Sequence, residues 1–508
     1  MRSVGFSART AFFLMLFVFG LAFSSFAQDA PAAPDAAPAP AQPAKPAKQP
    51  AKPAPKPAAK PGEVMPLDQP EQAASGEQAP APAPAAPAPK AKAAPAPAAS
   101  SGEGAAQIRP QKGMAVPAKS KLSGGKLTIG ALLPLTGPQA AQGQSSKAAL
   151  ELAASDINAY LSENGSTERV AIQVEDTASS GAKALERLKA LAVAGVRVVV
   201  GPYSDNEVDA VLDFANKNSI VLLSQGSAGP YLGKADNLMR FSPSDAYQAE
   251  ALAVLASQEG CNQLIAIWEG DMYGDELITH IKGQFTHQGG QVLAGTRFRP
   301  EVNQFASYVA DLKAQIDKQV KDKSKLAVVV AARGAQTAGI LREAAKLAGL
   351  GDAKWYGGDD SALRGSVISD QAVAQFAAKV RMAFARYGET GTSLYSELEK
   401  RLEDRLQAFV DTQAVVAYDI VWLAAFTAMA SGEDAAVLRK AIPATAERFY
   451  GASGWLALNE NGDRREDYDF DFWTIKNIDG KFYWVKTARY QYDPGSVKQL
   501  IINAPEKE

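Results

Sequence analysis

Histidine and cysteine, two of the side chains most often used in catalysis, are scarce in this chain and are not grouped. The 508 residues include two histidines and one cysteine. His280 and His287 lie seven positions apart in one amphipathic segment, which favours a surface helix over a metal site. Cys261 precedes an apolar run, which predicts a buried, unreactive thiol, and a disulfide within the chain is impossible.

Motifs for phosphate binding and for nucleophilic hydrolysis are absent from the sequence. It contains no glycine-rich loop ending in Gly-Lys-Ser/Thr and no nucleophile elbow. Residues 459–463 faintly resemble a calcium loop, but a glycine turn between two elements explains them better. We therefore expect a protein that is not an enzyme, with no catalytic residue, no metal and no cofactor.

Arg333 is the charged residue whose position suggests a binding role most directly. It follows the apolar run 326–330, a predicted strand, and residues at the carboxyl ends of parallel strands line ligand crevices. A guanidinium there favours a ligand with a second carboxylate or a polar amide over an aliphatic one. The alternative is that Arg333 turns outward and pairs with a surface acid.

Short apolar segments alternate with helical stretches from Lys126 onward, a pattern typical of parallel α/β proteins. The predicted strands are 128–133, 170–175, 196–200, 220–223, 264–268, 292–298, 326–330, 354–356 and 380–384. A long helix is predicted over 408–430, followed by strands 468–475 and 481–490 around an Asp-Gly turn. Because nine strands exceed one ordinary doubly wound sheet, we expect two lobes with a crevice between them.

The first 120 residues have a different character. Residues 1–27 resemble a signal peptide, with Arg2 and Arg9 before an apolar run and with Ser-Phe-Ala at the cleavage site. We expect cleavage near Ala27, a periplasmic location and no stable membrane insertion afterwards, because the run of about 13 residues is shorter than a bilayer span. A retained anchor is the alternative. Residues 28–120 are rich in Pro, Ala and Lys and lack aromatics, which predicts a disordered tether.

The overall charge is balanced, with a formal net charge of −2 and no long block of either sign. This distribution excludes the basic footprint of a nucleic-acid-binding protein. A small neutral or zwitterionic partner fits better.

A series of short motifs then gives a specific resemblance. In order, they are LLPLTGP (132–138), Asp-Ile-Asn (156–158), Glu-Asp (175–176), VVVGPYS (198–204), LLSQGSAGP (222–230), RFSPSDAYQ (240–248), MYGDEL (272–277), WYGGDD (355–360) and Gly-Asp-Arg (462–464). Together they resemble the branched-chain amino acid (Leu/Ile/Val) periplasmic solute-binding proteins of ABC transporters. The resemblance covers nearly all of residues 126–490.

The resemblance implies a type I periplasmic binding fold of two doubly wound parallel-sheet lobes joined by a three-strand hinge. Lobe one would span 126–243 plus 386–463, lobe two 244–385 plus 464–490, and 491–508 would form a C-terminal tail. The implied function is capture of an amino acid or related molecule, with an ABC transporter permease as partner. Activators of peptidoglycan synthesis carry a similar domain, so a non-transport sensor or activator remains the alternative.

The resemblance also implies site residues. A ligand carboxylate would be held in lobe one by Ser204 and by the segment Gln225, Gly226, Ser227 and Ala228. From lobe two, Tyr273 would cover the ligand and Asp359 would pair with its ammonium group. Gln142 and Arg333 fall where relatives carry other residue types, and Ala228 stands where a hydroxyl is common. These departures put a branched aliphatic ligand in doubt.

Overall fold

The computed structural model describes residues 117, 119–388, 392–465, 469–491 and 499–502. The expected signal peptide and nearly all of the expected tether lie outside the described residues. Every described residue belongs to the second of two units into which the chain divides, Pro97–Glu508.

The first sheet is fully parallel and forms lobe one. Its strands are β1 (Lys126–Leu133), β2 (Arg169–Asp176), β3 (Val198–Val200), β4 (Val221–Ser224) and β5 (Leu238–Arg240), in the order β2-β1-β3-β4-β5. Helices α2 (Gly181–Val193) and α3 (Asp205–Lys217) pack on one face in an apolar cluster with Leu132, Val199 and Leu222. Such strands are rich in Val and Leu because both faces are covered.

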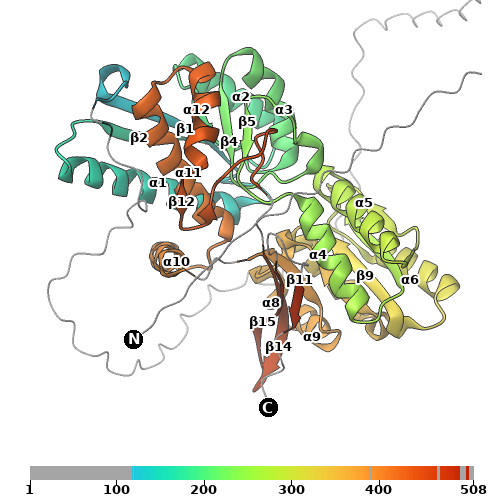
Figure 1. Ribbon diagram of the computed structural model, residues 1–508. Helices are drawn as coiled ribbons and strands as arrows, with labels where there is room; N and C mark the ends of the chain where they lie inside the picture. Colours follow the sequence, from blue (N-terminus) through green and yellow to red (C-terminus); the bar gives the residue numbers. More distant parts are fainter. Residues whose placement is uncertain (1–116, 118, 389–391, 466–468, 492–498, 503–508) are drawn as a thin grey trace, which may run out of the picture. The chain divides into compact units, whose positions relative to one another are not determined.

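The opposite face of this sheet is covered by helices distant in sequence. These are α1 (Ala140–Glu163), α10 (Ser393–Leu406), α11 (Thr412–Ser431) and α12 (Ala435–Ala446). A small ribbon of β12 (Tyr450–Gly451) and β13 (Gly454–Trp455) follows them. Figure 1 shows α1, α11 and α12 beside the strands of this sheet.

The second sheet, of lobe two, is mixed. Its parallel part comprises β6 (Gln263–Glu269), β7 (Gln291–Val292), β8 (Thr296–Phe298), β9 (Leu326–Ala331), β10 (Lys354–Gly357) and β11 (Ala383–Tyr387). Strands β14 (Phe470–Ile478), β15 (Lys481–Gln491) and β16 (Gln499–Ile502) add an antiparallel edge. Helices α4 (Asp245–Gln258) and α5 (Met272–His287) cover one face, and α6 (Ala306–Gln319), α7 (Gly334–Ala345), α8 (Gly365–Ile368) and α9 (Gln371–Lys379) complete the lobe.

The chain passes between the two sheets three times: between β5 and α4, between β11 and α10, and between β13 and β14. The predicted fold class, two doubly wound lobes joined by three segments of chain, is therefore confirmed. In each lobe the carboxyl ends of the parallel strands lead into the loops that would meet a ligand.

Several details differ from the sequence predictions. The predicted strand 292–298 is two short strands, β7 and β8, because Gly295 between them has a φ of 85°. The strand predicted over 380–384 starts only at Ala383, since Val380 caps α9 and Arg381 has a positive φ. The segment expected as a tail, 491–508, contains β16, which pairs with β15.

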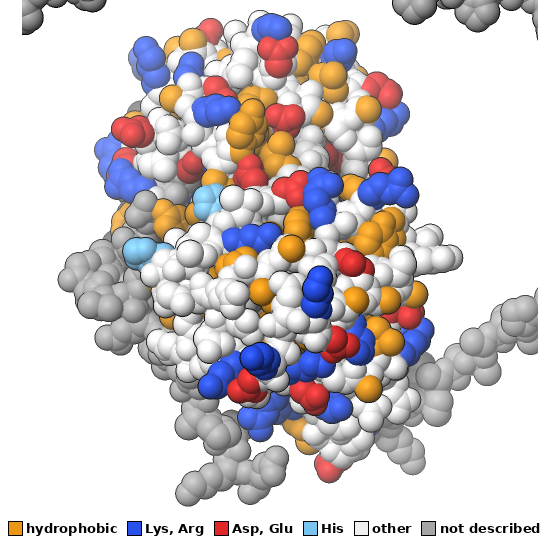
Figure 2. Space-filling model, turned by 90° about the vertical axis from the view of Figure 1, so that its right-hand side faces the viewer, with side chains coloured by type: hydrophobic (Ala, Val, Ile, Leu, Met, Phe, Trp, Pro, Cys, Tyr) orange, Lys and Arg blue, Asp and Glu red, His pale blue; other side chains and the backbone are white. Residues whose placement is uncertain are grey.

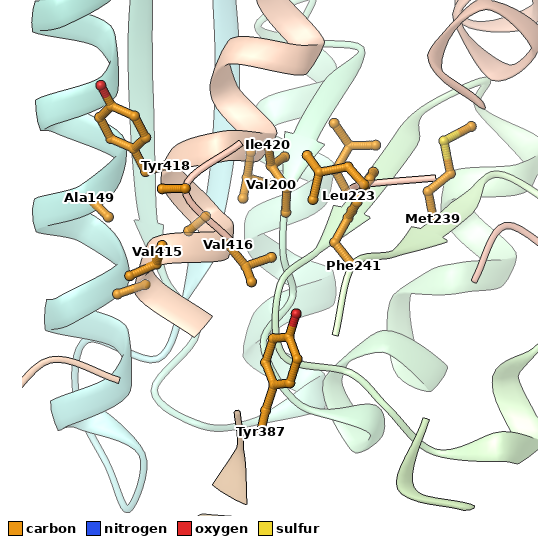
Figure 3. Packing of buried hydrophobic residues seen from close by; sticks show 14 of the residues in the cluster. Ala149, Val200, Leu223, Met239, Phe241, Tyr387, Val415, Val416, Tyr418 and Ile420 are labelled. Atoms are coloured by element: carbon orange, nitrogen blue, oxygen red, sulfur yellow. The ribbon is translucent and has the colours of Figure 1, made fainter. Parts of the chain in front are cut away.

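Helix α11 is the longest strongly apolar helix among the described residues, and it is a core element. Its 20 residues have a mean hydropathy of 1.6, enough by length and composition to cross a membrane, but 89% of the window is buried. Figure 3 shows Val415 of α11 beside Ala149 of α1, and Ile420 beside Val200 of β3. Asp411 caps its first turn by accepting from the Ala414 N–H at 2.9 Å, which fixes where α11 begins.

Candidate ligand-binding cleft

Ser204 occupies the N-cap of α3, at the end of the loop that follows β3. Its backbone N–H and its Oγ both donate to Glu207 Oε2, at 3.1 and 2.8 Å. This is the side-chain half of a capping box, which satisfies groups at the helix start. The residue therefore holds the helix N-terminus while its side chain lines a cavity between the lobes.

The loop after β4 divides the predicted segment into cavity-facing and inward-facing residues. Gly226 and Ala228 line the cavity, whereas Gln225 and Ser227 are fully buried. The Gln225 Nε2 donates to Ser146 Oγ at 3.3 Å, away from the cavity. Ser227 Oγ donates to Asp205 Oδ1 at 2.5 Å. Two of the four residues thus support the loop rather than face the cavity.

Tyr273 and Asp359 face the cavity from lobe two. Tyr273 lies in the first turn of α5, and its hydroxyl donates to Asp359 Oδ1 at 3.0 Å. Asp359 follows β10, and its backbone N–H donates to Gln248 Oε1 at 3.1 Å. Burial, with the neighbouring charge of Asp360 as a second cause, raises the pKa of Asp359 to about 6. The Asp359 carboxylate can therefore pair with a positively charged group in the cavity.

Arg333 lines the cavity, but its guanidinium is already paired. One nitrogen contacts Glu269 Oε2, and the other donates to Asp271 Oδ2 at 2.8 Å. Burial raises the pKa of Glu269 to about 7 even with Arg333 beside it. The arrangement matches neither sequence-based alternative, because Arg333 points inward and yet binds buried acids of its own lobe.

Gln142 lies in the first turn of α1 and is buried without lining the cavity. With its amide oriented to satisfy both neighbours, it donates to the Gln139 carbonyl and accepts from Arg364, each at 3.1 Å. Its observed contacts link α1 of lobe one to the segment after β10 in lobe two.

The cavity brings together six of the nine predicted residues: Ser204, Gly226, Ala228, Tyr273, Arg333 and Asp359. It is also lined by residues that sequence reasoning missed, namely Gln139, Tyr203, Asp205, Asn206, Asp245, Asp360 and Gln413. Asp205 and Asp245 each follow a serine that begins a helix, so they were indistinguishable from the acids common in first turns. Only the hydrogen-bond partners of Asp205 and Asp245 distinguish them from such acids, and the sequence does not show these partners.

Hydrogen bonds join the lobes at the rim of this cavity. Asn206 of α3 donates to Asp271 Oδ2 at 3.2 Å and accepts from the Met272 N–H at 3.4 Å. The Tyr231 N–H of lobe one donates to Glu276 Oε2 of α5 at 3.2 Å. The cavity measures about 30 Å³, room for one or two waters. In this arrangement of the lobes the cavity is too small to hold a larger molecule.

The molecular surface offers no competing site of strong charge on the face seen in Figure 2. Acidic and basic side chains are interspersed there, and histidine side chains lie at the surface. Both histidines belong to α5, with His287 exposed and His280 half-buried. Among the described residues, no three His, Cys, Asp or Glu side chains are grouped as metal ligands would be.

Comparison with known proteins gives the family. Residues 145–477 match the family described as receptor family ligand binding region. An uncharacterized protein of Methanocaldococcus jannaschii, MJ1266, is 25% identical over 66% of this chain and 84% of its own length. The Leu/Ile/Val-binding protein BraC3 of Rhizobium johnstonii is 25% identical over 39% of this chain and 54% of its own.

Among solved structures, the leucine-binding protein LivK of Thermotoga maritima superposes with a TM-score of 0.58 at 18% identity, covering 71% of this chain and 97% of that one. This likeness supports the fold. The match over 145–477 spans more than half of the chain. The chain therefore belongs to the receptor ligand-binding-region family and has the leucine-binding-protein-like fold of ABC-transporter solute-binding proteins.

Proposed function

We propose that this protein is the extracytoplasmic solute-binding component of an ABC-type importer. It captures a small polar or charged molecule between its lobes, and hinge closure creates the form that a membrane permease recognises. The observation that carries the proposal is the meeting of residues from both lobes at one cavity. Ser204 and Gly226 come from lobe one, and Tyr273 and Asp359 from lobe two.

The geometry supports a clamp rather than a preformed pocket. The cavity of about 30 Å³ is far smaller than the 300 Å³ or more of typical ligand sites. Its rim is held by a few hydrogen bonds between α3 and α5, each worth about 1 kcal/mol net. A ligand that pairs with the partly buried Asp359 carboxylate can offset the free energy lost when these hydrogen bonds break. Export to the periplasm, expected from residues 1–27, would place the clamp where an importer needs it.

A thermal-shift screen of the full chain against amino acids, amides, amines and aromatic acids tests this function. A true ligand at 100 times its Kd should add about 2.7 kcal/mol and raise the Tm by several degrees. Asp359→Asn and Ser204→Ala should each weaken binding more than they reduce stability. Asp322→Ala, at an exposed turn of lobe two, serves as a matched control.

If no small molecule raises the Tm, or if Asp359→Asn binds the ligand as well as the wild type, the clamp at this cleft is wrong. Equal binding by Ser204→Ala alone would remove that residue from the site and leave the clamp in place.

A further inference from the structure

The donors expected to hold a ligand carboxylate in lobe one already hold a carboxylate of the chain. Asp205, the residue after Ser204, accepts at one oxygen, Oδ1, from Ser227 Oγ at 2.5 Å and from the N–H groups of Ala228 and Gly229, both at 3.0 Å. Three donors converging on one oxygen form an anion-binding arrangement. Here the anion is Asp205.

Gly229 lets the backbone approach Asp205 closely, and a side chain there would crowd the two neighbouring carboxylates. A Cβ at that position would lie 3.0 Å from Asp205 Cγ and Oδ2 and 2.7 Å from Glu276 Oε2. Asp205, Ser227 and Gly229 all belong to lobe one, so separation of the lobes leaves their hydrogen bonds intact. The carboxylate-binding position is therefore filled in the open and closed clamp alike.

A ligand carboxylate would have to displace Asp205 from these donors. Asp205 is 6% exposed and would then be a buried charge without hydrogen bonds. Truncating one partner of a buried charged pair weakens association by a factor of about 30 or more. An amino acid held in the usual way of this fold therefore meets a penalty here.

One oxygen of a second carboxylate in the cavity lacks a hydrogen-bond donor from the described part of the chain. Asp245 begins α4 and is 3% exposed; its Oδ1 accepts from Gln248 Nε2 at 3.1 Å. Its Oδ2 is buried and has no hydrogen-bond partner among the described residues. Asp245 lines the cavity, so this oxygen calls for a donor from a ligand.

Acidic side chains outnumber basic ones around the cavity. Four carboxylates line it, from Asp205, Asp245, Asp359 and Asp360, against one guanidinium, that of Arg333. Arg333 is already shared by Glu269 and Asp271. Nearby Arg364 lies 3.7 Å from Asp411 and 4.0 Å from Asp360, and Arg240 pairs with Asp463 at 2.7 Å. The cavity thus has a surplus of acid that a cation would neutralise.

We propose that the cleft binds an organic cation without a carboxylate, namely an amine or a diamine. The ammonium group of this ligand donates hydrogen bonds to Asp245 and Asp359. This proposal rests on the proposed function and names its ligand class. An ammonium carries three donors, enough for Asp245 Oδ2 and for Asp359 beside Tyr273. Asp205 keeps its hydrogen bonds to Ser227, Ala228 and Gly229, and its negative charge also attracts the ammonium group.

Matched ligand pairs test the proposal by calorimetry with the full chain near neutral pH. 3-Methylbutylamine is leucine without its carboxylate, and 1,4-diaminobutane has an aminomethyl group in place of the carboxylate of 4-aminobutanoate. We expect each amine to bind at least tenfold more tightly than its carboxylate counterpart, by roughly 1.4 kcal/mol or more. Asp245→Asn should weaken amine binding about tenfold, whereas Asp209→Ala, an exposed acid on α3, should not change it.

The outcomes separate this inference from the proposed function. Tighter binding of leucine or 4-aminobutanoate overturns the inference and leaves the solute-binding function standing. Binding of neither class overturns both. Calcium ions that bind and exclude the amines would also overturn it, because the cavity would then be a metal site.

Asp205 itself gives an independent test. Asp205→Ala empties the anion-binding donors, so acetate should raise the Tm of this variant and leave that of the wild type unchanged. The variant should also gain affinity for leucine by about tenfold or more. Acetate with the same effect on both proteins, or on neither, contradicts the assignment. If Asp205→Ala does not fold, the amine preference of wild type and its loss in Asp245→Asn still decide the proposal.

Discussion

Arg333→Ala should destabilise the protein in a pH-dependent way. Its guanidinium compensates two buried acids whose side chains are only 2% and 4% exposed, those of Glu269 and Asp271. Removing the partner of a buried charge costs about 3–5 kcal/mol. Gln336, three positions after Arg333, donates to Glu269 Oε1 at 2.8 Å but cannot replace the lost charge.

The sign of the pH effect follows from Glu269. Its pKa in the folded protein, about 7, lies above the ordinary 4.5, so the folded state binds this proton more tightly than the unfolded state. Its ionisation therefore destabilises the fold increasingly as the pH rises from about 4.5 through 7, and losing Arg333 raises this pKa further. At about pH 5 Glu269 is protonated with or without Arg333, so its part of the loss disappears there. Because its pKa is about 7 when Arg333 is present, that part amounts to at most about 1.4 kcal/mol at pH 8.

Urea unfolding followed by circular dichroism at about pH 5 and pH 8 measures both losses. Arg342→Ala is the control, since Arg342 is 46% exposed and forms a surface pair with Asp370. The double variant Arg333→Ala with Glu269→Gln should recover part of the stability at the higher pH. Equal losses at the two pH values, or a double variant less stable than Arg333→Ala, would refute the reasoning.

Three further predictions concern the clamp and its support. Asn206→Ala removes a cross-lobe contact to Asp271, so small-angle scattering should give a larger radius of gyration; an unchanged radius would contradict a role in closure. Asp156→Ala removes the acceptor of Arg401 and Tyr418, at 2.7–2.9 Å, and should cost about 3–5 kcal/mol in urea unfolding, against no measurable change for an exposed control, Asp213→Ala. Amine binding should fall about tenfold from pH 7.5 to pH 5, because protonation of Asp359, with its pKa near 6, removes the charge; a flat profile would exclude Asp359 from the site.

The fold was predictable from the sequence because its signals are local. Buried strands such as 326–330 are continuous apolar runs, and the helices between them keep a regular spacing. Strand β5 has three residues, too few for any pattern, and β16 pairs with β15 through contacts that lie outside its own segment. The short length of β5 and the pairing of β16 with a separate segment explain why neither strand was predicted from the sequence.

The site was predictable only in part, for a similar reason. Ser204, Tyr273 and Asp359 were placed by motifs after strands, and the cavity includes all three. The partners were not predictable: Arg333 meets acids 62 and 64 positions away, and Asp205 meets Ser227 22 positions away. Such pairings depend on which loops the sheets bring together, and residue types alone do not carry this information.

Amide hydrogen exchange of the full chain, with and without the best ligand from the screen, tests the central claim most directly. If a solute binds between the lobes, protection should increase together at 226–229 in lobe one and at 272–274 and 358–361 in lobe two. These segments line the cavity from opposite sides. Protection confined to one lobe, or to segments away from the cavity, would contradict the account.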